Sequence, residues 1–164
     1  MGVLTAGKGL ADHAHGQLAQ AIQGGLASPH AMTGSLQITN QAKNVLNSVT
    51  ANYNGVRHVE PQLLQAVFDW ARTYTPNTQF VLPANTRVYL YVYDSPCPAC
   101  VQTMRICVKN WRDNNPSSTW KLGFTRWYLG GPLPEITRYP DQLTATQAYN
   151  GLQNHSGMSW EVKP

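Results

Sequence analysis

The segment RVYLYVYD at residues 87–94 predicts a β-strand that is apolar on both faces. Its side chains alternate, with Val88, Leu90 and Val92 on one face and Tyr89, Tyr91 and Tyr93 on the other. Such a strand is typical of the interior of a sheet that is covered on both sides. We therefore expect residues 87–94 to form a central strand.

A helix is expected to follow this strand at once. Ser95 belongs to the residue types that cap helix N-termini, and Pro96 suits the first position of a helix. Apolar side chains then recur at the three-and-four spacing of a helix: Cys97, Cys100, Met104, Cys107, Val108 and Trp111. Both thiols of the CPAC segment are therefore predicted to lie on the buried face of this helix, near its start.

The segment PQLLQAVFDWARTY at residues 61–74 predicts another helix, because its apolar side chains form one stripe. Glu60 falls on the same stripe and is expected to point inward. The other expected elements are a strand at 120–129, a helix at 144–154 and a short strand at 158–162, while 41–55 permits either a helix or strands. This alternation favours the α/β class, with a mixed β-sheet flanked by helices on both faces.

The chain of 164 residues is long enough for one domain with a hydrophobic core. We expect residues 1–35, which are rich in Gly, Ala, Gln and His, to form a glycine-rich N-terminal arm, and residues 36–164 to form the folded domain. One helix is predicted in the arm from the spacing of Leu10, Ala14, Leu18 and Ile22. His13, His15 and His30 could bind a metal weakly, although a polar arm is the simpler interpretation.

The formal charge of +4 and the pI near 9.1 favour polyanionic partners, because positive charge concentrates phosphate-bearing ligands. A membrane-spanning segment is not expected, since no apolar run approaches the ~20 residues that cross a bilayer. The N-terminus also lacks the apolar core of a secretory signal.

The cysteines are better explained by metal binding or thiol chemistry than by disulfides. Three cysteines cannot all pair within the chain, and small disulfide-stabilised domains usually have four or more. His58 and Glu60 in the segment RHVEP add an imidazole and a carboxylate. Two thiolates and one imidazole would leave one position open on a zinc ion, which is typical of a catalytic site. Cys107 would lie ~10 Å along the helix from Cys100, too far to share the ion.

The order His58-Val59-Glu60, then Pro96-Cys97-Pro98-Ala99-Cys100, resembles the signature of zinc-dependent nucleobase deaminases. The chain resembles the deaminase fold shared by cytidine deaminases, tRNA adenosine deaminases and the AID/APOBEC DNA-editing enzymes. A closer likeness is to the deaminase toxins of interbacterial competition, which are small C-terminal domains of polymorphic toxins. The motifs cover about nine residues, and the rest of the likeness is in the order of elements.

The resemblance implies that zinc is held by His58, Cys97 and Cys100, and that residues 36–164 are the catalytic domain. The metal would lower the pKa of a water that attacks C4 of cytosine, and Glu60 would carry the proton without binding the metal. The backbone N–H of Val59 would meet the base carbonyl, and the backbone carbonyl of Ser95 would accept from the departing amino group. Val59 departs from the family, where Ala is commoner, and this puts the substrate preference in doubt.

The implied reaction is the hydrolytic conversion of cytosine to uracil, with single-stranded DNA as the preferred substrate because its bases are not stacked in a duplex. Arg57, beside His58, would contact a phosphate or simply be solvated. Trp127 and Tyr128 lead into the loop that contacts the preceding base in the DNA-editing enzymes; they would stack on bases or pack in the core. The alternatives are double-stranded DNA, RNA, a free nucleoside, adenine as the base, or a non-catalytic zinc-stabilised binding module.

As a toxin domain, the chain would reach the cytoplasm of a target bacterial cell as part of a larger secreted protein. Its expected partners are nucleic acid and a cognate immunity protein that plugs the pocket, and no membrane. These expectations come from the family resemblance and from no single residue.

Overall fold

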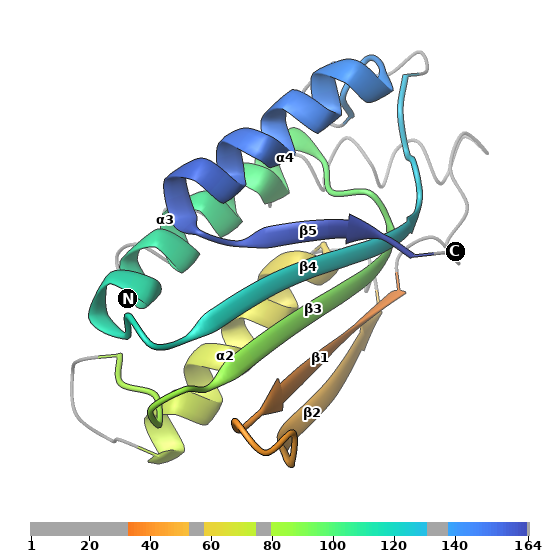
Figure 1. Cartoon of the computed structure of the whole chain (residues 1–164). Helices are drawn as coiled ribbons and strands as arrows, with labels where there is room; N and C mark the ends of the chain where they lie inside the picture. Colours follow the sequence, from red (N-terminus) through yellow and green to blue (C-terminus); the bar gives the residue numbers. More distant parts are fainter. Residues whose placement is uncertain (1–32, 53–57, 75–79, 131–137, 164) are drawn as a thin grey trace.

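The computed structural model describes residues 33–52, 58–74, 80–130 and 138–163, which form one five-stranded sheet and its covering helices (Figure 1). The elements are β1 (Thr33–Thr39), β2 (Val45–Asn52), α2 (Val59–Tyr74), β3 (Arg87–Asp94), α3 (Pro98–Asn114), β4 (Thr119–Arg126), α4 (Gln142–Ser156) and β5 (Ser159–Val162). The strand order across the sheet is β2-β1-β3-β4-β5. The predicted α/β class with a mixed sheet is therefore confirmed, and β3 is the central strand as expected.

The β1–β2 hairpin is the part of the sheet that the sequence did not predict. The ambiguous segment 41–55 contains β2, and β1 begins at Thr33, inside the predicted arm. Leu36 and Ile38 of β1 are fully buried, while Gln37 between them is exposed, which is the alternation of a half-buried strand. The division into an arm and a domain stays a prediction.

The two crossovers from β3 to β4 and from β4 to β5 set the edge where the functional residues gather. Both strand pairs are parallel, and α3 and α4 are the connecting helices. A parallel crossover returns the chain to the start of the next strand, so each connecting helix begins near the carboxyl end of a strand. The start of α3 therefore lies beside the end of β3.

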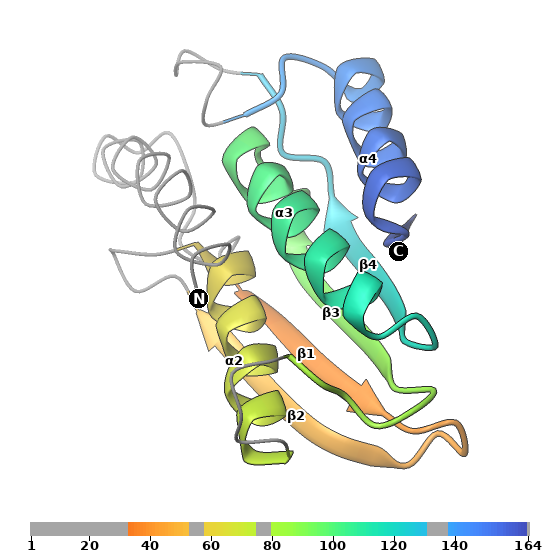
Figure 2. The same ribbon diagram turned by 90° about the vertical axis from the view of Figure 1, so that its left-hand side faces the viewer.

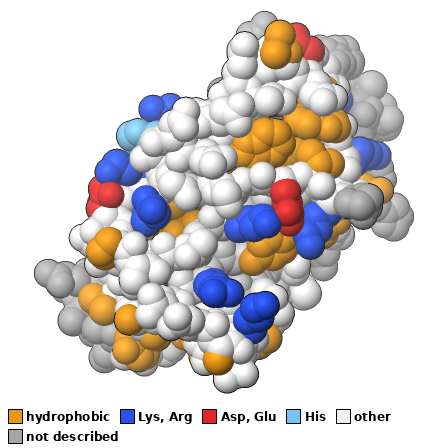
Figure 3. All heavy atoms as spheres, in the orientation of Figure 1, with side chains coloured by type: hydrophobic (Ala, Val, Ile, Leu, Met, Phe, Trp, Pro, Cys, Tyr) orange, Lys and Arg blue, Asp and Glu red, His pale blue; other side chains and the backbone are white. Residues whose placement is uncertain are grey.

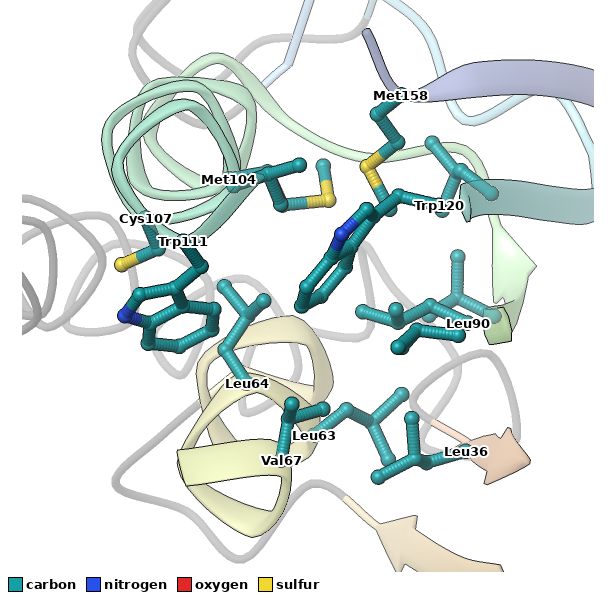
Figure 4. Close-up of a cluster of buried hydrophobic side chains, with 14 of the residues drawn as sticks. Leu36, Leu63, Leu64, Val67, Leu90, Met104, Cys107, Trp111, Trp120 and Met158 are labelled. Atoms are coloured by element: carbon teal, nitrogen blue, oxygen red, sulfur yellow. The ribbon is translucent and has the colours of Figure 1, made fainter. Parts of the chain in front are cut away.

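The hydrophobic core lies between one face of the sheet and all the helices of the described residues (Figure 2). Figure 4 shows its centre, where Leu63, Leu64 and Val67 of α2 and Met104, Cys107 and Trp111 of α3 meet Leu36, Leu90 and Trp120 of the sheet. The predicted stripe of 61–74 is thus buried, and Cys107 is a core residue. The ring of Trp111 stacks on Phe80 at 4.5 Å and closes the end of the core.

The opposite face of the sheet carries tyrosines and charged residues and faces the viewer in Figures 1 and 3. Lys121 and Lys163 pair there with Glu161 at 2.9 and 3.7 Å, and the Tyr89 hydroxyl donates to Glu161 at 3.3 Å. No helix in the ranges named above covers this face. We expected helices on both faces of the sheet, and the helices of the described residues cover one of them. Outside the described residues lie the predicted helix at 10–22 and the histidines of the arm, His13, His15 and His30.

No helix within the described part of the chain is both long and apolar enough to cross a membrane.

Candidate functional site

Three predicted metal ligands from two distant segments meet at the carboxyl edge of β3. His58 directly precedes α2, while Cys97 and Cys100 lie at the start of α3. The Nδ1 atom of His58 is 3.5 Å from Cys97 Sγ and 3.1 Å from Cys100 Sγ, and all three residues are buried. Zinc bonds of ~2.3 Å to sulfur and ~2.0 Å to nitrogen, at a tetrahedral angle, put such atoms about 3.5 Å apart. The three side chains could therefore hold a metal ion.

The start of α3 lies two residues later than the sequence predicted. Cys97, rather than Ser95, caps the helix in an extended conformation, and Pro98, rather than Pro96, is its first residue. The reason is that a residue before a proline is pushed out of the helical region, which excludes Cys97 from the helix. The Cys97 thiol accepts from the Cys100 N–H at 3.4 Å, so the cap itself brings the two sulfurs together.

Ser95 and Pro96 connect the site to the sheet and to α4 instead. The Ser95 N–H donates to the Arg126 carbonyl at 2.8 Å, and the Ser95 hydroxyl accepts from the Tyr128 N–H at 2.7 Å. The Pro96 carbonyl accepts from the Tyr149 hydroxyl at 2.7 Å. These bonds hold the turn before Cys97 from two sides.

The electrostatics of the thiol pair favour one thiolate. Burial by itself raises the pKa of Cys97, but hydrogen bonding to Cys100 and the charge of His58 outweigh it and lower the pKa of Cys97 well below its ordinary value. Burial and the neighbouring Cys97 raise the pKa of Cys100 well above its ordinary value. A divalent cation between the sulfurs would stabilise the second thiolate as well, because a coordinated thiol loses its proton.

Glu60 lies beside the ligands without joining them. Its side chain is buried and interacts with the Cys100 thiol, but among the described residues the metal-binding group consists of His58, Cys97 and Cys100 alone. Burial raises the pKa of Glu60 to about 7, against the opposing effect of His58. A carboxyl group that titrates near neutrality can both accept and donate a proton, as general acid–base catalysis requires.

Val59 is packed against a residue that sequence reasoning missed. A Cβ atom at Gly34 of β1 would lie 2.5 Å from Val59 Cγ1 and 2.7 Å from the Tyr91 carbonyl oxygen. Only glycine therefore fits between β1 and the start of α2. The backbone roles expected of Val59 and Ser95 stay predictions, although both residues lie in the segments that carry the site.

Of the predicted base-contacting residues, Trp127 and Tyr128 have different surroundings. The centre of the Trp127 ring lies 4.9 Å from that of Phe124 and 6.1 Å from that of Tyr149 on α4, so this ring packs among other aromatic side chains. The ring of Tyr128 faces the Arg138 guanidinium at 4.7 Å. Stacking on a base stays a prediction for both, and Arg57 lies outside the described residues.

The remaining residues that the sequence did not single out are Asp94, Arg126, Tyr139 and Tyr149. Arg126 binds the buried carboxylate of Asp94 in a bidentate pair at 2.7 and 3.0 Å, which joins the ends of β3 and β4. Burial, and then the charges of Cys97 and Cys100, raise the pKa of Tyr139. Tyr149 was detectable, because it follows Ala145 by four residues on the buried stripe of α4.

Comparisons with known proteins add little to these observations. No protein-family model and no curated protein matches the chain. Among solved structures, two of Acinetobacter baumannii RibD, called form 1 and form 2, are 14% and 15% identical to this chain, each with a TM-score of 0.40. Each alignment covers 93% of this chain and 35% of the RibD chain, so the chain spans about a third of their length. The interpretation of the site therefore depends on the residues of this chain.

Proposed function

We propose that the chain is a zinc-dependent deaminase that converts cytosine to uracil in nucleic acid, with single-stranded DNA as the preferred substrate. The observation that carries the proposal is the meeting of His58, Cys97 and Cys100 beside a buried acid that is not part of the metal-binding group, Glu60. A structural zinc site is normally closed by four protein ligands, whereas three ligands leave a position for a reactant. Zinc bound there would supply a water of lowered pKa as the nucleophile.

The protein groups account for the proton movements of the reaction. Water and cytosine yield uracil and ammonia, so one proton must reach the ring nitrogen beside C4 and another the departing amino group. Glu60, with its pKa near neutrality, can take the two protons of the attacking water one after the other and deliver one to the ring nitrogen and one to the amino group. The Val59 N–H and the Ser95 carbonyl would orient the base from either side.

The choice of nucleic acid as substrate is supported by the charge of +4 and by the placement of Tyr128 at the same edge of the sheet as the ligands. Single-stranded DNA is preferred because an unpaired base reaches the pocket without loss of duplex stacking. The role as an interbacterial toxin domain, with an immunity protein as partner, is supported by the sequence resemblance alone.

The test compares metal content and activity in four proteins. The wild type should contain one zinc ion per chain and form uracil in a single-stranded oligonucleotide, with double-stranded DNA, RNA and deoxycytidine assayed beside it. Glu60→Gln should keep the zinc and lose the activity, while Cys97→Ser should lose both. Cys107→Ala is the matched control, because this thiol lies in the core, and it should keep both.

Two results would contradict the proposal. One is a wild-type protein without stoichiometric zinc, and the other is a Glu60→Gln protein that still forms uracil. Zinc in a wild-type protein that deaminates none of the four substrates would instead indicate a binding module. For the toxin role, expression in bacteria should raise the frequency of C-to-T changes, and Glu60→Gln should abolish that rise.

A further inference from the structure

Arg138 is a buried cation with unused hydrogen-bond donors. Its side chain is 8% exposed, and its Nε and Nη2 atoms are buried without a hydrogen-bond partner among the described residues. The hydroxyl of Tyr128 is likewise buried without a partner in this part of the chain. The guanidinium lies 4.7 Å from the centre of the Tyr128 ring, which holds it in place by a cation–π contact and leaves the Nε–H and Nη2–H groups free of partners among the described residues.

This pair lies at the same edge of the sheet as the candidate metal centre. The Tyr128 N–H donates to the Ser95 hydroxyl at 2.7 Å, and Ser95 is two residues from Cys97. The chain around Arg138 is held to the end of β4, because the Gly130 N–H donates to the Tyr139 carbonyl at 2.8 Å. The position of Arg138 is therefore defined by the scaffold of the site.

The charged groups of the described residues do not fully neutralise Arg138. Asp94 is the nearby carboxylate that acts on it, but both Asp94 oxygens are already bound by Arg126, at 2.7 and 3.0 Å. The ion pairs formed within the described ranges do not include Arg138. Among the described residues, two guanidinium groups thus share one carboxylate, and burying a cation whose charge is not fully balanced is unfavourable.

The unused donors match a phosphate. Nε and Nη2 form one edge of the guanidinium fork, which binds two oxygens of a tetrahedral or planar anion at once. The Tyr128 hydroxyl can donate to a third oxygen, which a phosphate has and a carboxylate lacks. A phosphate next to a site that acts on a nucleobase would belong to a nucleotide.

We propose that Arg138 and Tyr128 form a phosphate-binding site beside the candidate metal centre, so that the substrate is a nucleotide or polynucleotide rather than a free nucleoside or base. This inference rests on the proposed deaminase function and names the residues that would bind a phosphate of its substrate. Arg138 would act as a binding residue that positions the substrate through its phosphate and takes no part in proton transfer.

The first experiment does not need catalysis. Inorganic phosphate is titrated into the zinc-loaded wild-type protein, and the Nε–H resonances of the arginines are followed by NMR. The Arg138 resonance should shift and saturate, while that of Arg87 should not. Arg87 is exposed at the start of β3, ~23 Å from Asp94 at the other end of the strand, at ~3.3 Å per residue. An Arg138 resonance that does not respond to phosphate overturns the proposal and leaves Arg138 as a residue that only packs on Tyr128.

The second experiment measures affinity for a single-stranded oligonucleotide with one cytosine, in proteins that also carry Glu60→Gln so that no substrate is consumed. Arg138→Gln should weaken binding about 10- to 100-fold, as expected for lost charge-assisted hydrogen bonds. Arg87→Gln removes the same charge far from the site and should weaken binding no more than about threefold. Equal losses in the two variants would mean that only net charge matters and would refute the site.

A milder variant guards against loss of folding. Tyr128→Phe removes one donor but keeps the ring under Arg138, and it should weaken oligonucleotide binding severalfold at an unchanged melting temperature. If Arg138→Gln fails to fold, Tyr128→Phe decides: wild-type affinity in that variant overturns the phosphate site.

Activity assays separate this inference from the proposed function. With active protein, kcat/KM for deoxycytidine monophosphate should exceed that for deoxycytidine at least tenfold, and Arg138→Gln should remove the difference. Uracil formation with equal kcat/KM for the two substrates would refute the phosphate site while the deaminase assignment stands. Phosphate binding through Arg138 in a protein that forms no uracil would support the site while the deaminase assignment fails.

Discussion

Replacing Glu60 with glutamine in the zinc-depleted protein should change how the stability of the fold depends on pH. Burial raises the pKa of Glu60 from 4.5 to about 7, so the folded protein holds this proton more tightly than the unfolded chain does. The stability that the protonated carboxyl contributes is fully present below pH 4.5 and is lost as the pH rises through about 7. At ~1.36 kcal/mol for each pKa unit, the loss between these values is about 3 kcal/mol.

The measurement is the free energy of unfolding in urea at several pH values from 4 to 8, with a chelator present. Glutamine cannot ionise, so Glu60→Gln should gain stability relative to the wild type by about 3 kcal/mol across this range. Glu161→Gln is the control, because Lys121 lowers the pKa of this carboxyl and its removal should act weakly in the opposite direction. A difference between Glu60→Gln and the wild type that stays constant with pH would refute the buried, raised-pKa state of Glu60.

Two further substitutions test the packing that supports the site. Gly34→Ala should destabilise the fold by about 2 kcal/mol in denaturant unfolding and weaken zinc binding, because the new Cβ would lie 2.5 Å from Val59 Cγ1. Gly151→Ala is the control: a Cβ there would have no atom within 4 Å, and the variant should be more stable by about 1 kcal/mol. Asn115→Ala should lower the free energy of unfolding by about 3 kcal/mol in the same measurement. The Asn115 side chain accepts from the Leu82 N–H at 2.8 Å and donates to the carbonyls of Phe80 and Trp111 at 2.9 Å, and the substitution removes these bonds. A decrease of less than about 1 kcal/mol would show that water replaces them.

The central strand and the helices around it were predictable from sequence because their periodic patterns are long and agree with their burial. β3 matches the predicted range 87–94, and α2 and α4 contain the predicted segments 61–74 and 144–154. β1 was missed because its buried residues, Leu36 and Ile38, are only two and follow a polar arm. β1 pairs with β2 in a local hairpin, but its pairing with β3 is non-local, and no periodic pattern within seven residues predicts it.

The start of α3 was misplaced because two competing signals lie two residues apart. Ser95-Pro96 and Cys97-Pro98 are both plausible caps with a following proline. The tertiary bonds decide between them, since the Ser95 N–H and hydroxyl are used by Arg126 and Tyr128 at the end of β4. The consequence is local, because both sulfurs still face His58.

The metal-binding part of the site and its anion-binding part differ in how far sequence can predict them. Metal ligands must be of a few residue types and must converge on one ion, as the ligand atoms of His58, Cys97 and Cys100 do within 4.8 Å of one another, so a short motif already restricts the geometry. An arginine in a loop rich in Gly and Pro is solvated by default, and nothing in the sequence separates Arg138 from the arginines of α3. Arg138 is placed by its contact with the Tyr128 ring and by the Gly130–Tyr139 hydrogen bond, and no sequence pattern predicts these tertiary contacts. A chain that kept both motifs but lost Arg138 would therefore be expected to bind zinc and to lose the proposed preference for phosphate-bearing substrates.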